Sequence, residues 1–444
     1  MSSGHIFQRD LTRHYPMLVR GEGVYVWDDQ GRRYLDSTSG ISVSCIGHGR
    51  ERVAEALRRQ AMTLAYTTSG YFTNQPAEAL AEQISRLAPG DLNNVFFTTG
   101  GSESVETAIK LARRYHLERG KAQKHLVIGR WASYHGATLA AVAASGHVVR
   151  RRLYTPYLLP FPHIAAAYCY RCPFDKTYPA CGLACARDLE RAILQAGAEH
   201  VAAFIAEPIV GAAAGAVVPP PDYFAAIREI CDRHDVLFIA DEVITGFGRT
   251  GAYFAMEHWG IVPDLMTVAK GIGGGYAALG AVLVSDRVKR AFSENMAAFA
   301  HGFTFSNHPL SCAAALEVLA IIEEERLVEA AARQGAYLQD RLRHLYRHPI
   351  VGDIRGMGLL AGVELVRDRE TREPFDATAR IADRLFQLCL ERGVIIYPGS
   401  GMVEGPRGDQ FLLCPPFIIS PAQIDELVDA LSGALDALTH ELSA

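Results

Sequence analysis

Lysine is scarce in this sequence, although arginine is abundant. Only six of the 444 residues are lysines, the formal net charge is -5, and the pI is near 6.4. A nucleic-acid-binding protein normally carries a basic face, so the composition gives no sign of a nucleic-acid partner. Because lysines are so few, one in an apolar, glycine-rich setting stands out. Only Lys270 has such a setting.

Long uninterrupted hydrophobic runs are also missing. A transmembrane helix needs about 20 consecutive apolar residues, and the apolar stretches here are shorter or are interrupted by charge. The first ten residues hold no apolar core of the kind found in signal peptides. We therefore expect a cytoplasmic protein without a membrane segment.

The cysteines are too few to form a disulfide scaffold, since there are nine in the whole chain. Four of them cluster in two pairs, with two residues inside the first pair and three inside the second: Cys169, Cys172, Cys181 and Cys185. This spacing permits a tetrahedral, structural zinc site. Reduced cysteines without a metal are the alternative, and the cluster indicates no catalytic role.

Short apolar runs alternate with helical patterns through the middle of the chain. A helix is predicted over 223–234, and strands are predicted over 95–97, 125–128, 201–206, 236–240, 265–268 and 280–284. Strands that are buried on both faces have continuous apolar runs of this kind. Alternating strands and helices predict an α/β domain with a large, mainly parallel sheet covered by helices.

The two ends of the chain have a different pattern. A hairpin is predicted over 24–36, one long helical region over 311–346, and a last helix from about 421. We expect 1–60 to be an N-terminal part of a small domain, 61–310 to be the large domain, and 311–444 to be the C-terminal small domain. Residues 400–410 have the composition of a mobile surface loop.

Lys270 follows the apolar run 265–268 and opens a glycine-rich turn, Lys-Gly-Ile-Gly-Gly-Gly. Ligands gather at strand ends in open α/β sheets. Desolvation favours the neutral, nucleophilic form of a lysine there, which imine formation with an aldehyde requires. An isolated lysine at a strand end is more commonly an ordinary surface residue, so this reading needs further support.

Four other features give that support. Gly101 and Ser102 lie where a glycine turn feeds a helix, which is an anion site. Asp241 ends another apolar strand and could pair with a protonated ring nitrogen. Tyr134 offers an aromatic face for stacking on a flat cofactor, and Thr304 offers a hydroxyl for a phosphate. Each feature alone is also typical of a helix cap, a strand-end carboxylate or a core aromatic.

Together and in this order, these motifs resemble the class III pyridoxal-phosphate aminotransferases, from about residue 15 to the last helix. The most specific pieces are the run Asp-Glu-Val-Ile-Thr-Gly-Phe-Gly-Arg-Thr-Gly from Asp241 and the Ala-Lys-Gly step 29 residues after Asp241. The resemblance implies PLP fold type I, with pyridoxal 5'-phosphate as cofactor and a homodimer whose active sites are shared across the interface.

The resemblance also implies roles for single residues. Lys270 would form the Schiff base with the cofactor and carry protons, and Asp241 would pair with the pyridine nitrogen. Thr304 would reach the phosphate of the partner subunit. The other implied cofactor contacts are Gly101, Ser102, Tyr134, His135, Glu207 and Val243.

Ile244 stands where many members of that family have glutamine. The same substitution is familiar in a branch that resembles ω-amino acid or amine:pyruvate transaminases. The implied reaction is transfer of an amino group from an amine or ω-amino acid to a keto acid such as pyruvate or 2-oxoglutarate. A decarboxylase or aminomutase on the same scaffold is an alternative, and a non-catalytic nucleotide-binding protein is a weaker one.

Three residues are candidates for substrate binding. Arg407 in the 400–410 loop is suited to grip the carboxylate of a keto acid, because arginine binds carboxylates bidentately; a solvated loop arginine is the alternative. Trp27 and Tyr71 are candidates for the donor pocket and could equally be core or interface residues. The sequence names neither the donor nor the acceptor.

Overall fold

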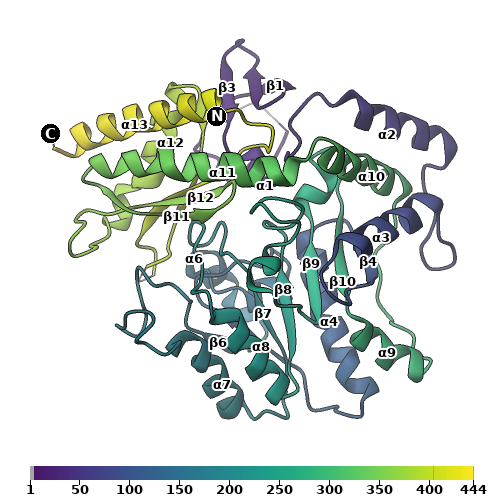
Figure 1. The fold of residues 1–444 in the computed structure, drawn as a ribbon. Helices are drawn as coiled ribbons and strands as arrows, with labels where there is room; N and C mark the ends of the chain where they lie inside the picture. The colour runs from purple at the N-terminus through teal and green to yellow at the C-terminus, as the bar shows by residue number, and fades with distance from the viewer. Residues whose placement is uncertain (1–4, 404, 444) are drawn as a thin grey trace.

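A computed structural model describes residues 5–403 and 405–443 (Figure 1). Its main sheet has seven strands, and only β10 runs antiparallel to its neighbours. Their order across the sheet is β4 (Asn94–Thr98), β10 (Gly280–Val284), β9 (Leu265–Val268), β8 (Leu237–Asp241), β7 (Val201–Ala206), β5 (Leu126–Arg130) and β6 (His163–Ile164). The predicted mainly parallel sheet is confirmed.

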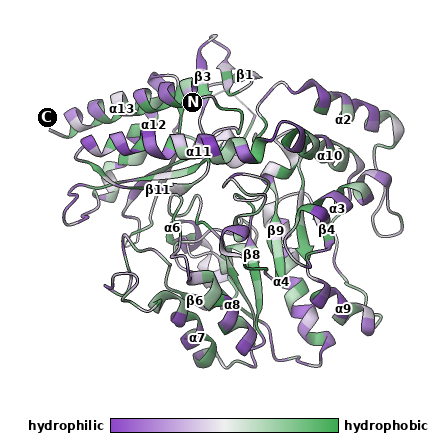
Figure 2. Cartoon of the chain, in the orientation of Figure 1, coloured by the Kyte–Doolittle hydropathy of each residue, from purple (hydrophilic) through white to green (hydrophobic). Residues whose placement is uncertain are grey.

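Helices cover both faces of this sheet because its strands are apolar on both sides. Along β8, Leu237 and Ile239 pack in the cluster that contains α4 (Gly101–Glu118), whereas Phe238 and Ala240 pack in the cluster that contains α7 (Ala184–Ala196) and α8 (Tyr223–Arg233). Figure 2 shows the hydrophobic strands inside and hydrophilic outer helix surfaces. The arrangement leaves the strand ends as the accessible edge.

A smaller α/β domain is built from both ends of the chain. Its antiparallel sheet has the order β11 (Val351–Met357), β12 (Leu360–Leu365), β15 (Asp409–Leu413) and β14 (Tyr397–Ser400). Its long helices are α11 (Leu327–Arg343), α12 (Ile381–Glu391) and α13 (Pro421–Ser443). The N-terminal strands β1 (Leu18–Glu22), β2 (Tyr25–Asp28) and β3 (Arg33–Asp36) pair in sequence, and β13 (Val394–Ile395) then pairs with β3. The domain boundaries at 60 and 310 stay predictions.

The single long helix predicted over 311–346 is wrong. The chain forms α10 (Pro309–Glu324) and then α11, and Arg326 between them has φ 53° and ψ 47°. A left-handed residue cannot continue a right-handed helix, so the chain changes direction there. Helix α10 packs on α2 (Glu51–Thr63) and α3 (Gln75–Leu87), whereas α11 packs on α13. The segment around Arg326 therefore connects the two domains.

No helix in the described part of the chain has both the length and the apolar character needed to cross a membrane. The cytoplasmic location stays a prediction.

Candidate active site

One cavity lies at the edge of the sheet where β4, β5, β7, β8 and β9 end. It holds about 580 Å³ of space, counted with its open mouth, and its lining residues are Gly101, Ser102, Tyr134, His135, Gly136, Glu207, Asp241, Val243, Ile244 and Lys270. The folded chain thus brings together every predicted cofactor contact except Thr304. The carboxyl ends of parallel strands meet at one edge, which explains why residues so far apart in sequence converge.

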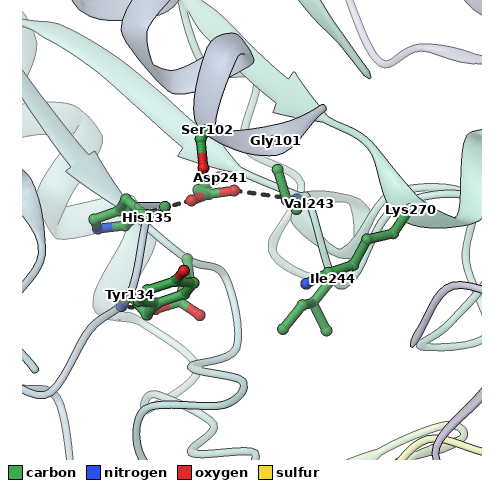
Figure 3. A pocket seen from close by; sticks show the side chains of 10 residues that line it. Gly101, Ser102, Tyr134, His135, Asp241, Val243, Ile244 and Lys270 are labelled. Carbon is green, nitrogen blue, oxygen red and sulfur yellow. Dashed lines mark hydrogen bonds and ion pairs between the residues drawn. The ribbon is translucent and has the colours of Figure 1, made fainter. Parts of the chain in front are cut away.

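Lys270 follows β9 and has a φ of 51°, which is uncommon for a residue other than glycine. Backbone strain of this kind is concentrated at functional sites. In Figure 3 the side chain points into the space between Tyr134 and Ile244. Burial lowers the pKa of the Lys270 amine, and the nearby negative charge of Asp241 opposes that effect. The amine is therefore neutral more often than an exposed lysine.

Asp241 lies at the end of β8 and is only 4% exposed. Its Oδ2 is 2.7 Å from His135 Nδ1, and its Oδ1 accepts hydrogen bonds from the Val243 amide and the Thr267 hydroxyl, each at 3.1 Å. A carboxylate only accepts hydrogen bonds, so His135 Nδ1 carries the proton in this pair. The network holds a negative charge at the floor of the cavity (Figure 3).

The start of helix α4 forms an open cradle. A Cβ on Gly101 would lie 2.8 Å from Val243 Cγ1, and a Cβ on Gly136 would lie 2.6 Å from Ser102 Oγ. Only glycine leaves this space open. The first N–H groups of α4 have no partner within the helix, and the positive end of the helix dipole lies there. A phosphate group fits this set of donors.

Glu207 supports the aromatic wall of the cavity. Its Oε1 accepts from the Tyr134 amide at 3.0 Å, and its Oε2 accepts from the Gly211 amide at 2.9 Å. Burial raises the pKa of this carboxyl. Figure 3 shows Tyr134 on one side of the space and Val243 and Ile244 on the other. The parts of a pyridoxal-phosphate site are all present here: a phosphate cradle, side walls for a ring, the Asp241 carboxylate and the Lys270 amine.

The other predicted site residues lie outside the cavity of this chain. Thr304 is exposed, and its carbonyl accepts from Tyr66 Oη at 2.9 Å. Tyr71 is 87% exposed, and Trp27 lies under the Arg20 guanidinium at 4.6 Å. The Arg407 guanidinium forms an ion pair with Glu373.

Sequence reasoning assigned no role to Thr267 or Gly136. Thr267 is a hydroxyl residue inside the apolar strand β9, and that polar interruption was a signal that could have pointed to it. Gly136 follows Tyr134 and His135 in the sequence, but only the folded chain shows that its missing side chain makes room for Ser102.

The structure gives no support to the predicted zinc site. The four clustered cysteines line one small cavity, yet among residues 5–403 and 405–443 no group of three or more histidine, cysteine, aspartate or glutamate side chains is placed to hold a metal. Cys169 is exposed, whereas Cys185 is buried and its burial raises its pKa to about 11.

A family model described as aminotransferase class-III matches residues 6–435. The chain belongs to the class III aminotransferases. This family uses pyridoxal phosphate, in agreement with the geometry above. The enzyme is thus a transaminase, as the sequence predicted.

Named relatives of this aminotransferase span nearly its whole length. It is 40% identical to a putrescine–pyruvate aminotransferase of Pseudomonas aeruginosa, over 95% of this chain and 90% of that protein. It is 37% identical to a diaminobutyrate–2-oxoglutarate transaminase of Halomonas elongata, over 96% of this chain and 92% of that protein. The solved structure of an (S)-enantioselective omega-transaminase from Thermomicrobium roseum superposes with a TM-score of 0.92 at 39% identity, over 98% of this chain and 96% of that one.

Proposed function

We propose that this aminotransferase moves an amino group from a primary amine or ω-amino acid to a keto acid such as pyruvate or 2-oxoglutarate. The observation that carries the proposal is that Lys270 and Asp241 face one cavity with a phosphate cradle at its end. The relatives named for putrescine, diaminobutyrate, pyruvate and 2-oxoglutarate support this class of donor and acceptor.

Different residues would hold different parts of pyridoxal phosphate. Gly101 and Ser102 would hold the phosphate at the start of α4, Tyr134 and Val243 would lie against the two faces of the ring, and Asp241 would pair with the ring nitrogen. When bound, the cofactor supplies an electron sink for negative charge on the carbon beside the substrate nitrogen. Asp241 strengthens that sink by keeping a proton on the ring nitrogen.

Lys270 would anchor the cofactor through its amine and would also move the proton. Its neutral amine would take a proton from the substrate carbon and would later give that proton back. The lowered pKa of Lys270 suits this role, because only the unprotonated amine can accept a proton. The decarboxylase, aminomutase and nucleotide-binding alternatives gain no support from any contact in the cavity.

We also propose a homodimer in which Thr304 completes the cradle of the partner subunit. Thr304 lies outside its own cavity and beside exposed aromatic side chains, since Phe305 is 53% exposed and Tyr66, which donates to the Thr304 carbonyl, is 43% exposed. Coexpression of Lys270→Ala chains with Thr304→Glu chains tests this arrangement. If the active site is shared between subunits, each mixed dimer should regain one working site. If each site lies within one chain, the mixed dimers should be no more active than dimers of the Thr304→Glu chain alone.

Arg407, Trp27 and Tyr71 remain our proposed substrate contacts. The loop between β14 and β15 carries Arg407, and Met402 and Val403 of that loop pack in the same apolar cluster as Tyr134. Arg407 is thus connected to the cavity wall, although its guanidinium is paired with Glu373. We propose that it exchanges this partner for the carboxylate of a keto acid.

Visible absorbance tests the proposed function. The purified protein with added pyridoxal phosphate should show a yellow band that particular amines bleach and that pyruvate or 2-oxoglutarate restores. Lys270→Ala should abolish both changes, and Lys289→Ala, at an exposed lysine, should leave them intact. A colourless wild type, or a Lys270→Ala variant that turns over, would contradict the proposal.

A further inference from the structure

The four clustered cysteines surround a small cavity of their own. The residues that line it do not overlap with those of the active-site cavity. The four thiols differ in exposure: Cys169 is exposed, Cys172 and Cys181 are half-buried, and Cys185 is buried. Amino transfer uses none of these groups, so a set of close thiols with one open to solvent needs a separate explanation.

Cys169 and Cys172 are the first and fourth residues of a tight turn, with Tyr170 and Arg171 as its middle residues. The first and fourth Cα atoms of a β-turn lie within about 7 Å of each other. A disulfide spans Cα distances of about 4.4–6.8 Å. A second turn follows directly, in which the Asp175 amide donates to the Cys172 carbonyl at 3.1 Å. The first turn thus places two thiols within reach of one disulfide.

The turn is connected to the small domain through Arg171. The Arg171 Nε donates to Glu364 of β12, with which it forms an ion pair. Glu364 is fully buried, and it also accepts hydrogen bonds from Tyr168 Oη and from Arg355 Nη1. A buried carboxylate that loses one of its donors is destabilised. A rearrangement of the turn therefore disturbs a buried network between the two domains.

The same network reaches the wall of the active site. Tyr168 belongs to an apolar cluster against which Tyr134 packs. Arg355 Nε donates to the Gly215 carbonyl at 2.7 Å, in the segment that follows Glu207. Glu207 in turn accepts from the Tyr134 amide at 3.0 Å. Packed side chains and hydrogen bonds thus connect the turn with the cavity, which is the physical route that coupling between two sites requires.

We propose that Cys169 and Cys172 form a reversible disulfide that slows amino transfer. The oxidant is a low-molecular-weight disulfide such as glutathione disulfide. The Cys169 thiolate attacks one sulfur of this reagent and releases one thiol, and the Cys172 thiolate then attacks the Cys169 sulfur and releases the second. The two cysteines lose two electrons and two protons, and the reagent becomes two thiols. Closing this ring shifts Arg171, which lies between the two cysteines, relative to Glu364.

The disulfide should form slowly at neutral pH and faster at higher pH. Burial raises the pKa of the Cys169 thiol, with further contributions from the neighbouring thiols of Cys172 and Cys181. Only the thiolate attacks a disulfide, so below that pKa the rate of formation should rise roughly tenfold for each pH unit. A rate that does not change with pH would overturn the attack by Cys169.

The test treats the purified enzyme, loaded with its cofactor, with glutathione disulfide. Peptide mapping should find Cys169 joined to Cys172. The rate of amino transfer from the pyridoxamine 5'-phosphate form to pyruvate should fall roughly tenfold, the order of effect of a slightly misplaced group in an active site. The visible circular dichroism of the bound cofactor should change as well, because Tyr134 lines its cavity. Dithiothreitol should reverse every change.

Two serine variants separate this pair of cysteines from other pairings. Cys172→Ser should keep one glutathione on Cys169 and form no internal disulfide. Cys181→Ser changes another half-buried cysteine of the same cavity, and it should oxidise and slow down as the wild type does. The reduced forms of both variants should transfer amino groups at the wild-type rate, which shows that they are folded.

Each result has a definite meaning. The absence of a disulfide, or Cys169 joined to a different cysteine, would overturn the proposal. An oxidised wild type that keeps its rate and its circular dichroism would also overturn it. Zinc bound to the purified protein by these cysteines in a one-to-one ratio would do the same, because metal-bound thiolates are not free to attack.

Failure of the proposed function would look different. A reduced wild type that transfers amino groups to neither pyruvate nor 2-oxoglutarate would contradict the proposed acceptors. The peptide map and the circular dichroism of the bound cofactor would then decide the disulfide proposal, since neither measurement depends on a substrate.

Discussion

His135 Nδ1 lies 2.7 Å from Asp241 Oδ2, and both side chains are buried. His135 follows β5 and Asp241 ends β8, and these two strands are separated in the sheet by β7. We therefore propose that the histidine acts on the cofactor ring through the carboxylate that it holds. Its other ring nitrogen, Nε2, is buried without a hydrogen-bond partner in the described structure.

Replacing His135 by alanine should slow amino transfer and leave the cofactor bound. A hydrogen bond to a charged group contributes about 1.5–3 kcal/mol, so we expect kcat to fall roughly 10- to 100-fold. Asp241→Asn should cost more, since the negative charge itself is lost. Half-reaction rates by stopped-flow absorbance measure both effects. His440→Ala, at an exposed histidine, is the control; equal rates for His135→Ala and this control would contradict the role of His135.

The pH dependence of cofactor attachment should reveal the lowered pKa of Lys270. Attachment needs the neutral amine, so the rate should rise with pH and level off above the pKa of the folded protein. Because burial lowers that pKa, the midpoint should lie below the ordinary value of 10.5. Stopped-flow mixing of apoprotein with pyridoxal phosphate between about pH 6 and 10 measures it.

Charge changes near Lys270 should shift that midpoint in opposite directions. Asp241 raises the pKa of Lys270 and Arg150 lowers it. Asp241→Asn should therefore move the midpoint down, and Arg150→Met should move it up. A midpoint of 10.5 in the wild type, or shifts of the same sign in both variants, would show that the electrostatic account is wrong.

Gly101→Ala should weaken cofactor binding by roughly tenfold, because its Cβ would lie 2.8 Å from Val243 Cγ1 in the cradle and displace a wall of the site. The adjacent Gly100 is the matched control. Its backbone is extended, with φ 179°, and a Cβ there would meet no atom within 4 Å. Dissociation constants for pyridoxal phosphate, from fluorescence titration, should separate the two alanine variants. Similar losses in both would argue against the cradle.

The break between α10 and α11 makes a prediction about stability. Arg326→Gly should raise the free energy of unfolding by about 0.5–1 kcal/mol, since glycine adopts the left-handed conformation without a Cβ penalty. Arg333→Gly, at an exposed position inside α11, should lower it by about 1 kcal/mol. Urea unfolding of both variants tests the opposite signs, and a loss of stability in Arg326→Gly would refute the prediction.

Residues with a local signature were predictable. Lys270, Asp241 and Gly101 each lie where an apolar strand run meets a turn, and that junction is visible in a window of about ten residues. Arg326 was not predictable, because Glu-Glu-Glu-Arg contains neither glycine nor proline to mark a break. The two helices separate there because they pack on different domains, which no local window contains.

The sequence by itself determined the family and the α/β class, since these depend on short motifs and on the apolar pattern. Only the tertiary structure decided which side chain each charged residue contacts. Asp241 meets His135, Arg407 meets Glu373, and Arg150 meets Tyr134 and Tyr397. The physical reason is that these partners come from different strands and domains, and the environment of a charge depends on packing across the whole chain.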